Sequence, residues 1–340
     1  MKAGDSVERV ILGHGSGGRL MHDLIRKVFA ARFDNPLLRQ GDDSARFSLD
    51  GQRLAFTTDS YVVKPLFFPG GDIGRLAVCG TVNDLATAGA QPLYLSAAFV
   101  IEEGLPLDHL ERIVSSMQAA AEEAGVQVVT GDTKVVEKGS ADGLFVNTAG
   151  LGIIPPGVDL SGANARPGDV VILSGTIGDH GIAVLSQREG FRFEVEVQSD
   201  AAPLNGLLQA ALEVTPEVRV ARDPTRGGLA TTLNEIAAQS KVAIRLEESA
   251  IPVRHAVRAA CEMLGYDPLY VANEGKLVLI VAPAAAQAVV RRLRRERYGE
   301  DAAAIGKVLE GPAGRVLLTT GIGGTRIVDL LAGEMLPRIC

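Results

Sequence analysis

Segments of strand length and helix length alternate along almost the whole chain, and this alternation restricts the fold more than any other feature. "RLAFTTD" (53–59) and "LYLSAAFVI" (93–101) are short apolar runs typical of strands. Between them, "GDIGRLAVCGTVNDLATAGA" (71–90) predicts a helix with small residues on its packed face. "LDHLERIVSSMQAAAEEAG" (107–125) predicts a second helix that ends at a glycine C-cap. The pattern indicates an α/β fold.

The second half repeats the alternation after a segment rich in Pro, Gly and Ser, "IPPGVDLSGANARPG" (154–168), which is typical of a domain boundary. A length of 340 residues also exceeds what one hydrophobic core usually holds. We therefore predict an N-terminal domain over 1–155, a C-terminal α/β domain over 156–325 and a mobile tail over 326–340. The remaining expected elements are strands at 126–132, 143–154, 169–175, 242–246, 276–282, 303–310 and 315–320, and helices at 178–189, 228–240, 253–264 and 284–298.

Charge, hydropathy and cysteine content argue against several classes of protein. The formal net charge is -7, and the arginines of "RRLRRER" (291–297) recur at helical spacing behind an apolar face, so we expect no nucleic-acid partner. The chain start lacks an apolar signal core, and no apolar run reaches the roughly 18 residues of a membrane span. Three cysteines without paired spacing indicate free thiols in a reducing compartment, so we expect a cytoplasmic protein. The five histidines (14, 22, 109, 180 and 255) form no zinc-binding pattern with these cysteines.

Acidic residues recur at loops beside the expected strands and helices. Singly, each is well explained as a turn residue or a helix N-cap, except Asp84, which falls inside a helical pattern. Together they fit a different interpretation, because Mg²⁺ prefers several carboxylate oxygens together with phosphate oxygens. If these loops converge, they would hold a magnesium–nucleotide. The residues are Asp42 and Asp43 in "GDDSA", Asp59 in "TTDS", Asp84 in "VNDLA", Asp132 in "TGDTK" and Asp223 in "RDPTRGG".

Three glycine-containing loops add to this pattern. "GHGSGG" (13–18) matches neither a Walker A motif nor a dinucleotide-binding turn, and is either a plain flexible loop or a lid that contacts phosphate. "DPTRGGL" (223–229) places a carboxylate, an arginine and two glycines at the start of a helix, whose N-terminus favours anions. "NEGKL" (273–277) places Asn273 and Glu274 in a tight turn, with either a structural or a catalytic role.

Taken in order, "GDDSA", "TTDSYVV", "GRLAVCGTVNDLATAGAQP", "TGDTKVV" and "DPTRGGL" resemble the aminoimidazole ribonucleotide synthetase superfamily over nearly the whole chain. That superfamily also includes selenophosphate synthetase and thiamine monophosphate kinase. The resemblance implies two α/β domains, with the strands of the N-terminal ATP-binding domain forming a barrel across a homodimer. It implies Mg²⁺ ligands at Asp43, Asp59, Asp84, Asp132 and Asp223, with Asp42 less firmly matched. It implies ATP contacts at these five and at Asn83, Thr133, Arg226 and Gly227.

The end of the sequence, "PRIC", places Cys340 last, and together with "GHGSGG" it resembles the carbamoyl dehydratases of nickel–iron hydrogenase maturation. The resemblance implies that a carbamoyltransferase loads Cys340 and that the protein dehydrates the carbamoyl group with ATP to a thiocyanate. The cyano group then passes to iron on a scaffold complex. A stretched tail of fifteen residues would reach roughly 50 Å, enough to visit a partner and return.

The chemistry needs a phosphoryl transfer and a base. A thiocarbamate loses water with difficulty because oxide is a poor leaving group, whereas phosphate leaves readily once the carbonyl oxygen is phosphorylated. Positioning and charge neutralisation dominate such a transfer. Candidates for the base that removes the N–H protons are Glu274 and Lys134, with His14 as a third. The other histidines, Cys79 and Cys261 are expected to be packing or surface residues.

Two alternatives remain open at this stage. The first is another ATP-dependent small-molecule kinase or synthetase of the same superfamily, although Ser16 stands where selenophosphate synthetases usually carry a reactive cysteine or selenocysteine. The second is a non-catalytic carrier that only presents Cys340 to partners. The second alternative predicts no nucleotide binding.

Overall fold

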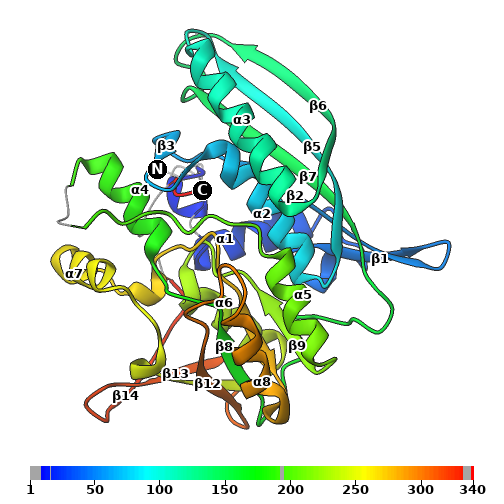
Figure 1. Cartoon of the computed structure of the whole chain (residues 1–340), viewed down its shortest axis with the longest axis vertical. Coiled ribbons are helices and arrows are strands. Elements are labelled where there is room, and N and C mark those ends of the chain that lie inside the picture. The colour runs from blue at the N-terminus through cyan, green and yellow to red at the C-terminus, as the bar shows by residue number, and fades with distance from the viewer. Residues whose placement is uncertain (1–8, 16, 192–194, 332–337) are drawn as a thin grey trace, which may run out of the picture.

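The computed structural model describes residues 9–15, 17–191, 195–331 and 338–340 of the chain. Figure 1 shows two parts, each built on its own sheet, with α2, α3 and β2, β5, β6 and β7 in the upper part and β8, β12, β13 and α8 in the lower part. The expected two-domain α/β fold is confirmed.

The N-terminal sheet has the strand order β1-β2-β7-β5-β6, in which β5 and β6 run parallel and the other neighbours are antiparallel. A parallel pair needs a crossover, which α3 (Leu107–Ala124) supplies. One face packs on α2 (Ile73–Thr87), as the strict alternation of buried and half-buried residues along β7 indicates. The strands are β1 (Ala45–Leu49), β2 (Gln52–Tyr61), β5 (Gln91–Glu102), β6 (Gln127–Val136) and β7 (Leu144–Ile153).

The opposite, outer face of this sheet carries exposed apolar side chains. Phe56 and Tyr94 are each 46% exposed and Val100 is 37% exposed. The outermost strands are β1 and β6, so the sheet does not close into a barrel within the part of one chain that the structure describes.

Helix α2 begins and ends as its sequence dictates. Asp72 is its N-cap, with Oδ1 accepting from the backbone N–H groups of Gly74 (2.8 Å) and Arg75 (3.0 Å). Small residues let it approach its neighbours closely, since a Cβ on Gly74 would lie 2.4 Å from the carbonyl oxygen of Ile113 on α3. The predicted C-cap of α3 is confirmed, because Gly125 adopts a left-handed conformation (φ 71).

The C-terminal sheet has the order β14-β13-β10-β12-β8-β11-β9. Its central strands β8 and β11 are almost fully buried, because helices pack against the sheet. The strands are β8 (Val170–Leu173), β9 (Val218–Arg222), β10 (Ala243–Glu247), β11 (Val278–Val281), β12 (Ala303–Leu309), β13 (Arg315–Thr319) and β14 (Thr325–Ile327); the helices are α4 (Asp179–Glu189), α5 (Asn205–Val214), α6 (Gly228–Gln239), α7 (His255–Leu264) and α8 (Pro283–Leu293).

Every helix and strand expected from the sequence is present, and the structure adds others. The expected helix at 284–298 is wrong over its last residues, because α8 ends at Leu293 and the chain turns at Tyr298 (φ 71) toward β12. The additional elements are α1 (Arg19–Leu24), β1, α5, β9, β14, the two-residue strands β3 (Phe67–Phe68) and β4 (Gly71–Asp72), 3-10 turns at Leu12–Gly15, Leu38–Gln40, Glu248–Ala250 and Pro268–Tyr270, and a π-helical turn at Ile25–Ala30.

Gly18 and Arg19, near the start of the described chain, lie beside Leu331, and Figure 1 marks the C-terminus near the centre of the molecule. The N–H of Arg19 donates to the carbonyl oxygen of Leu331 at 3.0 Å, and a Cβ on Gly18 would lie 2.5 Å from that oxygen. The predicted tail begins within β14, and residues 332–337 lie outside the described residues. Among the described helices, none is both long and apolar enough to cross a bilayer.

Candidate active site

A small cavity of about 40 Å³ lies where the two domains meet, and Cys340 lines it. Carboxylates from four separate segments surround the same space, which confirms that these distant motifs converge. The lining residues are Asp59, Ser60 and Tyr61 of β2, Gly80 and Asp84 of α2, Asp223, Thr225 and Arg226 of the β9–α6 loop, Glu274 and Cys340.

The pleat of β2 and the packing of α2 position the first two carboxylates. Thr57, Asp59 and Tyr61 alternate along β2 and face α2. The hydroxyl of Thr57 donates to Oδ2 of Asp84 at 2.7 Å, which orients this residue of α2 toward the strand. The hydroxyl of Tyr61 donates to Oδ2 of Asp59 at 3.3 Å. Tyr61 is 3% exposed, and the sequence analysis did not identify it as a site residue.

Arg222 links the N-terminal acidic loop to the C-terminal domain. Its Nε lies 2.9 Å from Oδ2 of Asp43, and its Nη2 donates to Glu235 at 2.9 Å. Burial raises the pKa of Asp43 to about 7, while the guanidinium of Arg222 opposes this rise. Asp42 pairs instead with Arg46 at 2.7 Å and accepts from the N–H of Gly162, so it holds the interdomain segment.

The carboxylates in and beside the cavity raise one another's pKa values. Burial raises the pKa of Asp84 well above its usual range, and the charges of Asp59, Asp223 and Asp43 raise it further. Burial also raises the pKa of Asp59, against the opposing charge of Arg226, and it raises the pKa of Asp223. In the ligand-free site, burial and mutual repulsion therefore disfavour the ionised form of these carboxyl groups.

A group of carboxyls that repel one another when ionised fits a site for a cation, such as the magnesium of a magnesium–nucleotide. Across the described ranges, no three His, Cys, Asp or Glu side chains already stand as a metal-ligand group. Mg²⁺ usually binds through one or two carboxylates, several waters and phosphate oxygens, so it does not need such a group. Asp59, Asp84 and Asp223 have the donor chemistry to hold it.

Glu274 lies in a tightly fixed buried turn. Its N–H donates to Oδ1 of Asp200 at 3.1 Å, and Oδ2 of Asp200 lies 3.0 Å from Nζ of Lys276. Its carboxylate atom Oε1 is buried without a hydrogen-bond partner. Burial, followed by the charge of Asp223, raises the pKa of Glu274 well above its usual range. A fixed carboxyl group with a raised pKa is a suitable proton acceptor once it is ionised.

Asn83 and Asn273 fix the main chain around this turn. The side-chain amide of Asn83 donates to the carbonyl oxygens of Ala202 (3.0 Å) and Glu274 (3.3 Å). Asn273 accepts from the N–H of Gly178 at 2.8 Å. The structure thus places Asn83, a predicted ATP contact, in a buried junction between the domains.

Arg226 and Gly227 begin α6 beside the cavity. Gly227 is the left-handed N-cap (φ 76), and a Cβ there would lie 2.1 Å from Oγ1 of Thr231. Arg226 contacts the N-terminal glycine loop, since a Cβ on Gly17 would lie 2.8 Å from its Cβ. Ser16 is outside the described residues, and the ring of His14, the third candidate base, accepts from the N–H of Ile11 at 3.1 Å.

The predicted residues Asp132, Thr133 and Lys134 are not brought to this cavity within one chain. They lie on the edge strand β6, where Nζ of Lys134 donates to Asp132 at 2.6 Å. In the sheet, Asp59 pairs with Thr148 of β7, Thr148 pairs with Ala97 of β5, and Ala97 pairs with Gly131 of β6. Three strand spacings, about 14 Å, therefore separate β2 from β6 at this level.

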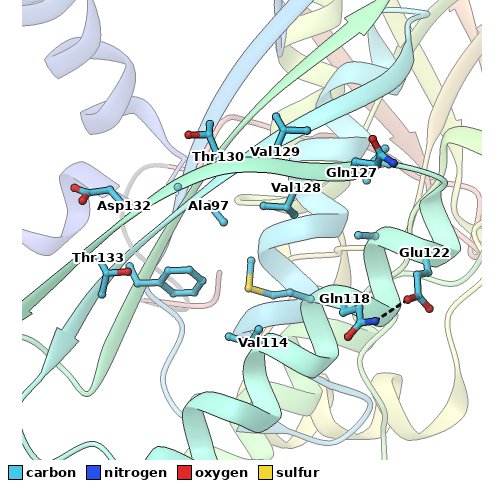
Figure 2. A pocket seen from close by; sticks show the side chains of 15 residues that line it. Ala97, Val114, Gln118, Glu122, Gln127, Val128, Val129, Thr130, Asp132 and Thr133 are labelled. Atoms are coloured by element: carbon cyan, nitrogen blue, oxygen red, sulfur yellow. Dashed lines mark hydrogen bonds between the residues drawn. The ribbon is translucent and has the colours of Figure 1, made fainter.

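Asp132 also lies on the other side of the sheet from Asp59. Gly131 is on the same face as Asp59, the face that packs on α2, and the next residue of a strand points to the opposite face. Figure 2 shows a cavity of about 950 Å³ between α3 and β6, with Val128 on the side of α3 and Thr130 and Asp132 on the opposite side. A bulge in the β5–β6 register between Leu95 and Ser96 produces this arrangement.

Comparison with known proteins agrees with this geometry. The family described as AIR synthase related protein matches through its N-terminal domain at residues 41–154 and its C-terminal domain at residues 166–319. The carbamoyl dehydratase HypE of Cupriavidus necator is 57% identical over 333 residues, covering 98% of this chain and 95% of that protein.

Solved structures of HypE are also similar. HypE in a complex with HypF has a TM-score of 0.87 and 51% identity, covering 91% of this chain and 99% of that chain. HypE in complex with ATP has a TM-score of 0.83 and 52% identity, covering 98% of this chain and 100% of that chain. The convergent acidic cavity and these matches together show that the chain belongs to the HypE carbamoyl dehydratases, ATP-dependent enzymes within the AIR synthase related family.

Proposed function

We propose that the protein uses ATP to dehydrate an S-carbamoyl group on its own Cys340 to a thiocyanate, which supplies the cyanide ligand of a nickel–iron hydrogenase centre. The observation that carries this proposal is that Cys340 shares one cavity with Asp59, Asp84, Asp223 and Glu274. One water needs about 10–15 Å³ of such space. A cavity of about 40 Å³ therefore has room for the carbon, oxygen and nitrogen of a carbamoyl group.

The reaction has two balanced steps. The carbonyl oxygen of the thiocarbamate first takes the γ-phosphoryl group of ATP, ADP leaves, and one N–H proton is lost to give S–C(=NH)–O–phosphate. The carbon–oxygen bond then breaks, phosphate leaves with the oxygen, and loss of the second N–H proton gives S–C≡N. Such transfers depend on positioning and on charge neutralisation.

The residues of the cavity have distinct roles in these steps. Glu274 takes an N–H proton, since its Oε1 is buried, unpartnered and held on a fixed turn. Arg226 lines the same cavity as Cys340 and is placed to stabilise negative charge that develops near the sulfur. Magnesium held by Asp59, Asp84 and Asp223, with Asp43 beside them, would neutralise the triphosphate.

We propose that Cys340 receives its carbamoyl group while it is outside this cavity. Cys340 is a partly buried residue, and burial of its thiol raises the pKa to about 12, against the opposing charge of Arg226. Because the thiolate is the nucleophile, the thiol reacts slowly here. The first residues of the predicted tail are fixed, because Arg326 and Ile327 belong to β14 and Val328 is fully buried. We therefore propose that the part of the tail after Leu331, which carries Cys340, acts as a mobile arm. The arm visits a carbamoyltransferase for loading and an iron-scaffold complex for cyanide transfer, and the solved HypE–HypF complex supports such a protein partner.

A homodimer completes the proposal. The exposed outer face with Phe56, Tyr94 and Val100, together with the exposed edge strand β6, is suited to pair with a second copy and close a barrel. In that dimer we propose that Asp132 and Lys134 of one chain, with Thr133, act at the nucleotide of the other.

Intact-mass analysis after incubation with the carbamoyltransferase, a carbamoyl donor and ATP–magnesium tests the proposal. Wild-type protein should gain one carbamoyl group without ATP, and with ATP the adduct should lose one water. Cys340→Ser should gain neither, whereas Cys261→Ser, which changes a buried thiol of α7, should behave as wild type. An adduct on Cys340→Ser would show that the acceptor is another residue.

A further inference from the structure

The last described residues, 338–340, lie along residues 62–64 of the N-terminal domain. The N–H of Val62 donates to the carbonyl oxygen of Cys340 at 3.1 Å, and the N–H of Lys64 donates to that of Arg338 at 3.4 Å. These bonds add the end of the chain to residues 62–64 much as a bound peptide adds a strand.

The side chain of Arg338 has its own binding partners. Its Nη1 forms an ion pair with Asp142, and its Nε donates to the carbonyl oxygen of Val62 at 3.0 Å. Arg188 spans the two segments, with Nη2 donating to the carbonyl oxygen of Arg338 at 2.6 Å and Nε to that of Lys64 at 2.8 Å. Arg338 has φ 51, a left-handed conformation that a non-glycine residue keeps only where surrounding contacts hold it.

Ile339 is bound from two sides. Its side chain is 3% exposed and belongs to the hydrophobic core cluster that contains Val63, Phe68 and Val184. Its carbonyl oxygen lies 2.8 Å from Nε2 of His180, and Nδ1 of the same ring lies 2.8 Å from the hydroxyl of Ser199. Since a carbonyl oxygen only accepts, Nε2 carries the hydrogen.

Among the side-chain hydrogen bonds and ion pairs that residues 338–340 make with the described residues, none involves the sulfur of Cys340. The specific contacts are made with Arg338 and with the buried Ile339. We propose that residues 62–64, Asp142, His180 and Arg188 form a tail receptor that recognises Arg-Ile rather than the thiol, and that therefore binds an extended Arg-Ile-Cys peptide in trans, including the tail of a second copy. Such recognition is the same before and after modification of the sulfur.

Thiol labelling of the full-length chain measures occupancy of the receptor. Iodoacetamide should modify Cys340 slowly while the tail is docked, and intact mass of the C-terminal peptide gives the rate. Cys79 and Cys261 are 0% and 1% exposed and serve as internal references. No ATP or carbamoyl donor is needed, so failure of this test and failure of the proposed dehydration are separate results.

Removal of one receptor charge tests recognition of Arg338. In Asp142→Asn, iodoacetamide should label Cys340 up to about fivefold faster than in wild type, because an ion pair between partly exposed side chains contributes up to about 1 kcal/mol. Arg338→Gln should have the same effect, and the double variant should label no faster than either single variant. Asp50→Asn, at an exposed turn between β1 and β2, is the matched control. If Cys340 of Asp142→Asn is labelled at the wild-type rate while the thermal unfolding of the variant is unchanged, the proposal is overturned.

Competition with a free peptide tests whether the tail receptor binds a tail that is not part of the same chain. A tethered segment acts at a millimolar effective concentration, so about 10 mM of the peptide Met-Leu-Pro-Arg-Ile-Ser is needed to compete. This peptide should increase the labelling rate of wild-type Cys340 several-fold, whereas Met-Leu-Pro-Gln-Ile-Ser should not. If neither peptide changes the rate, the receptor does not act in trans, and equal effects would overturn the role of the arginine.

Discussion

Gly80 of α2 lies directly against the hydroxyl of Tyr61 on β2, so that a Cβ on Gly80 would be 2.2 Å from Tyr61 Oη. This close approach lets the hydroxyl reach Asp59. The pKa of Tyr61 is raised well above its usual range, chiefly by burial, so the group stays a hydrogen-bond donor at neutral pH. The absence of a side chain at Gly80 of α2 therefore lets the hydroxyl of Tyr61 orient the carboxylate of Asp59 on β2.

Gly80→Ala should push Tyr61 away from Asp59 and lower cyano-adduct formation. Overpacking should cost about 1–3 kcal/mol of unfolding free energy, reduced by the ~1 kcal/mol that alanine gains in a helix. In a Tyr61→Phe background the nearest remaining ring atom is 3.1 Å away, so the same substitution should cost less. Denaturant unfolding of wild type, the two single variants and the double variant checks this, and additive costs would contradict the contact.

Asp84→Asn should separate stability from nucleotide binding. It removes one of several mutually repelling buried carboxylates, so the ligand-free protein should be as stable as wild type or more stable. The increase in melting temperature on adding ATP and magnesium should be lost. Calorimetric titration with ATP–magnesium checks the binding, with Asp50→Asn as control. Retained binding by Asp84→Asn would remove this residue from the nucleotide site.

The ligand-free protein should lose stability as the pH rises toward 7. Burial raises the pKa of Asp43 in the folded state to about 7, from an ordinary value of 3.8. The folded state thus holds a proton that the unfolded state releases, so this contribution is full below about pH 4 and declines as pH rises toward 7. The difference in melting temperature between wild type and Asp43→Asn, measured from pH 4.5 to 8, isolates the effect. A difference that does not change with pH would contradict it.

Mixed dimers should show whether Lys134 acts across chains. Lys134→Ala and Glu274→Gln should each be inactive alone. In the proposed homodimer, a mixed pair has one site with both groups intact, so random mixing should restore about a quarter of wild-type activity. Single-turnover formation of the cyano adduct measures this. No recovery, with mixed dimers verified by native mass spectrometry, would place both groups in one chain.

Much of the site could be predicted because its carboxylates belong to short ordered motifs. Asp59, Asp84, Asp223, Glu274 and Cys340 all line one cavity, as expected. The separation of Asp132 from Asp59 could not be predicted, because it depends on strand order and on a bulge, and a one-residue shift moves a side chain to the other face.

Other residues were missed because their local sequence gives little signal. Strand β9 has only five residues, two of them arginines, so neither the strand nor the role of Arg222 was expected. Tyr61 follows the recognised aspartate by two positions, and only the packing of Gly80 reveals its role. His180 was expected to be a packing or surface residue; it is buried, and it also contacts Ile339.

The hydrogen bond from Arg19 to Leu331 makes the two termini one mechanical unit. In the arm proposed above, the pivot after Leu331 would be set by Gly18 and Arg19, more than three hundred positions earlier in the sequence. Loss of that contact would let the sulfur of the proposed arm reach a wider volume than the intact enzyme allows.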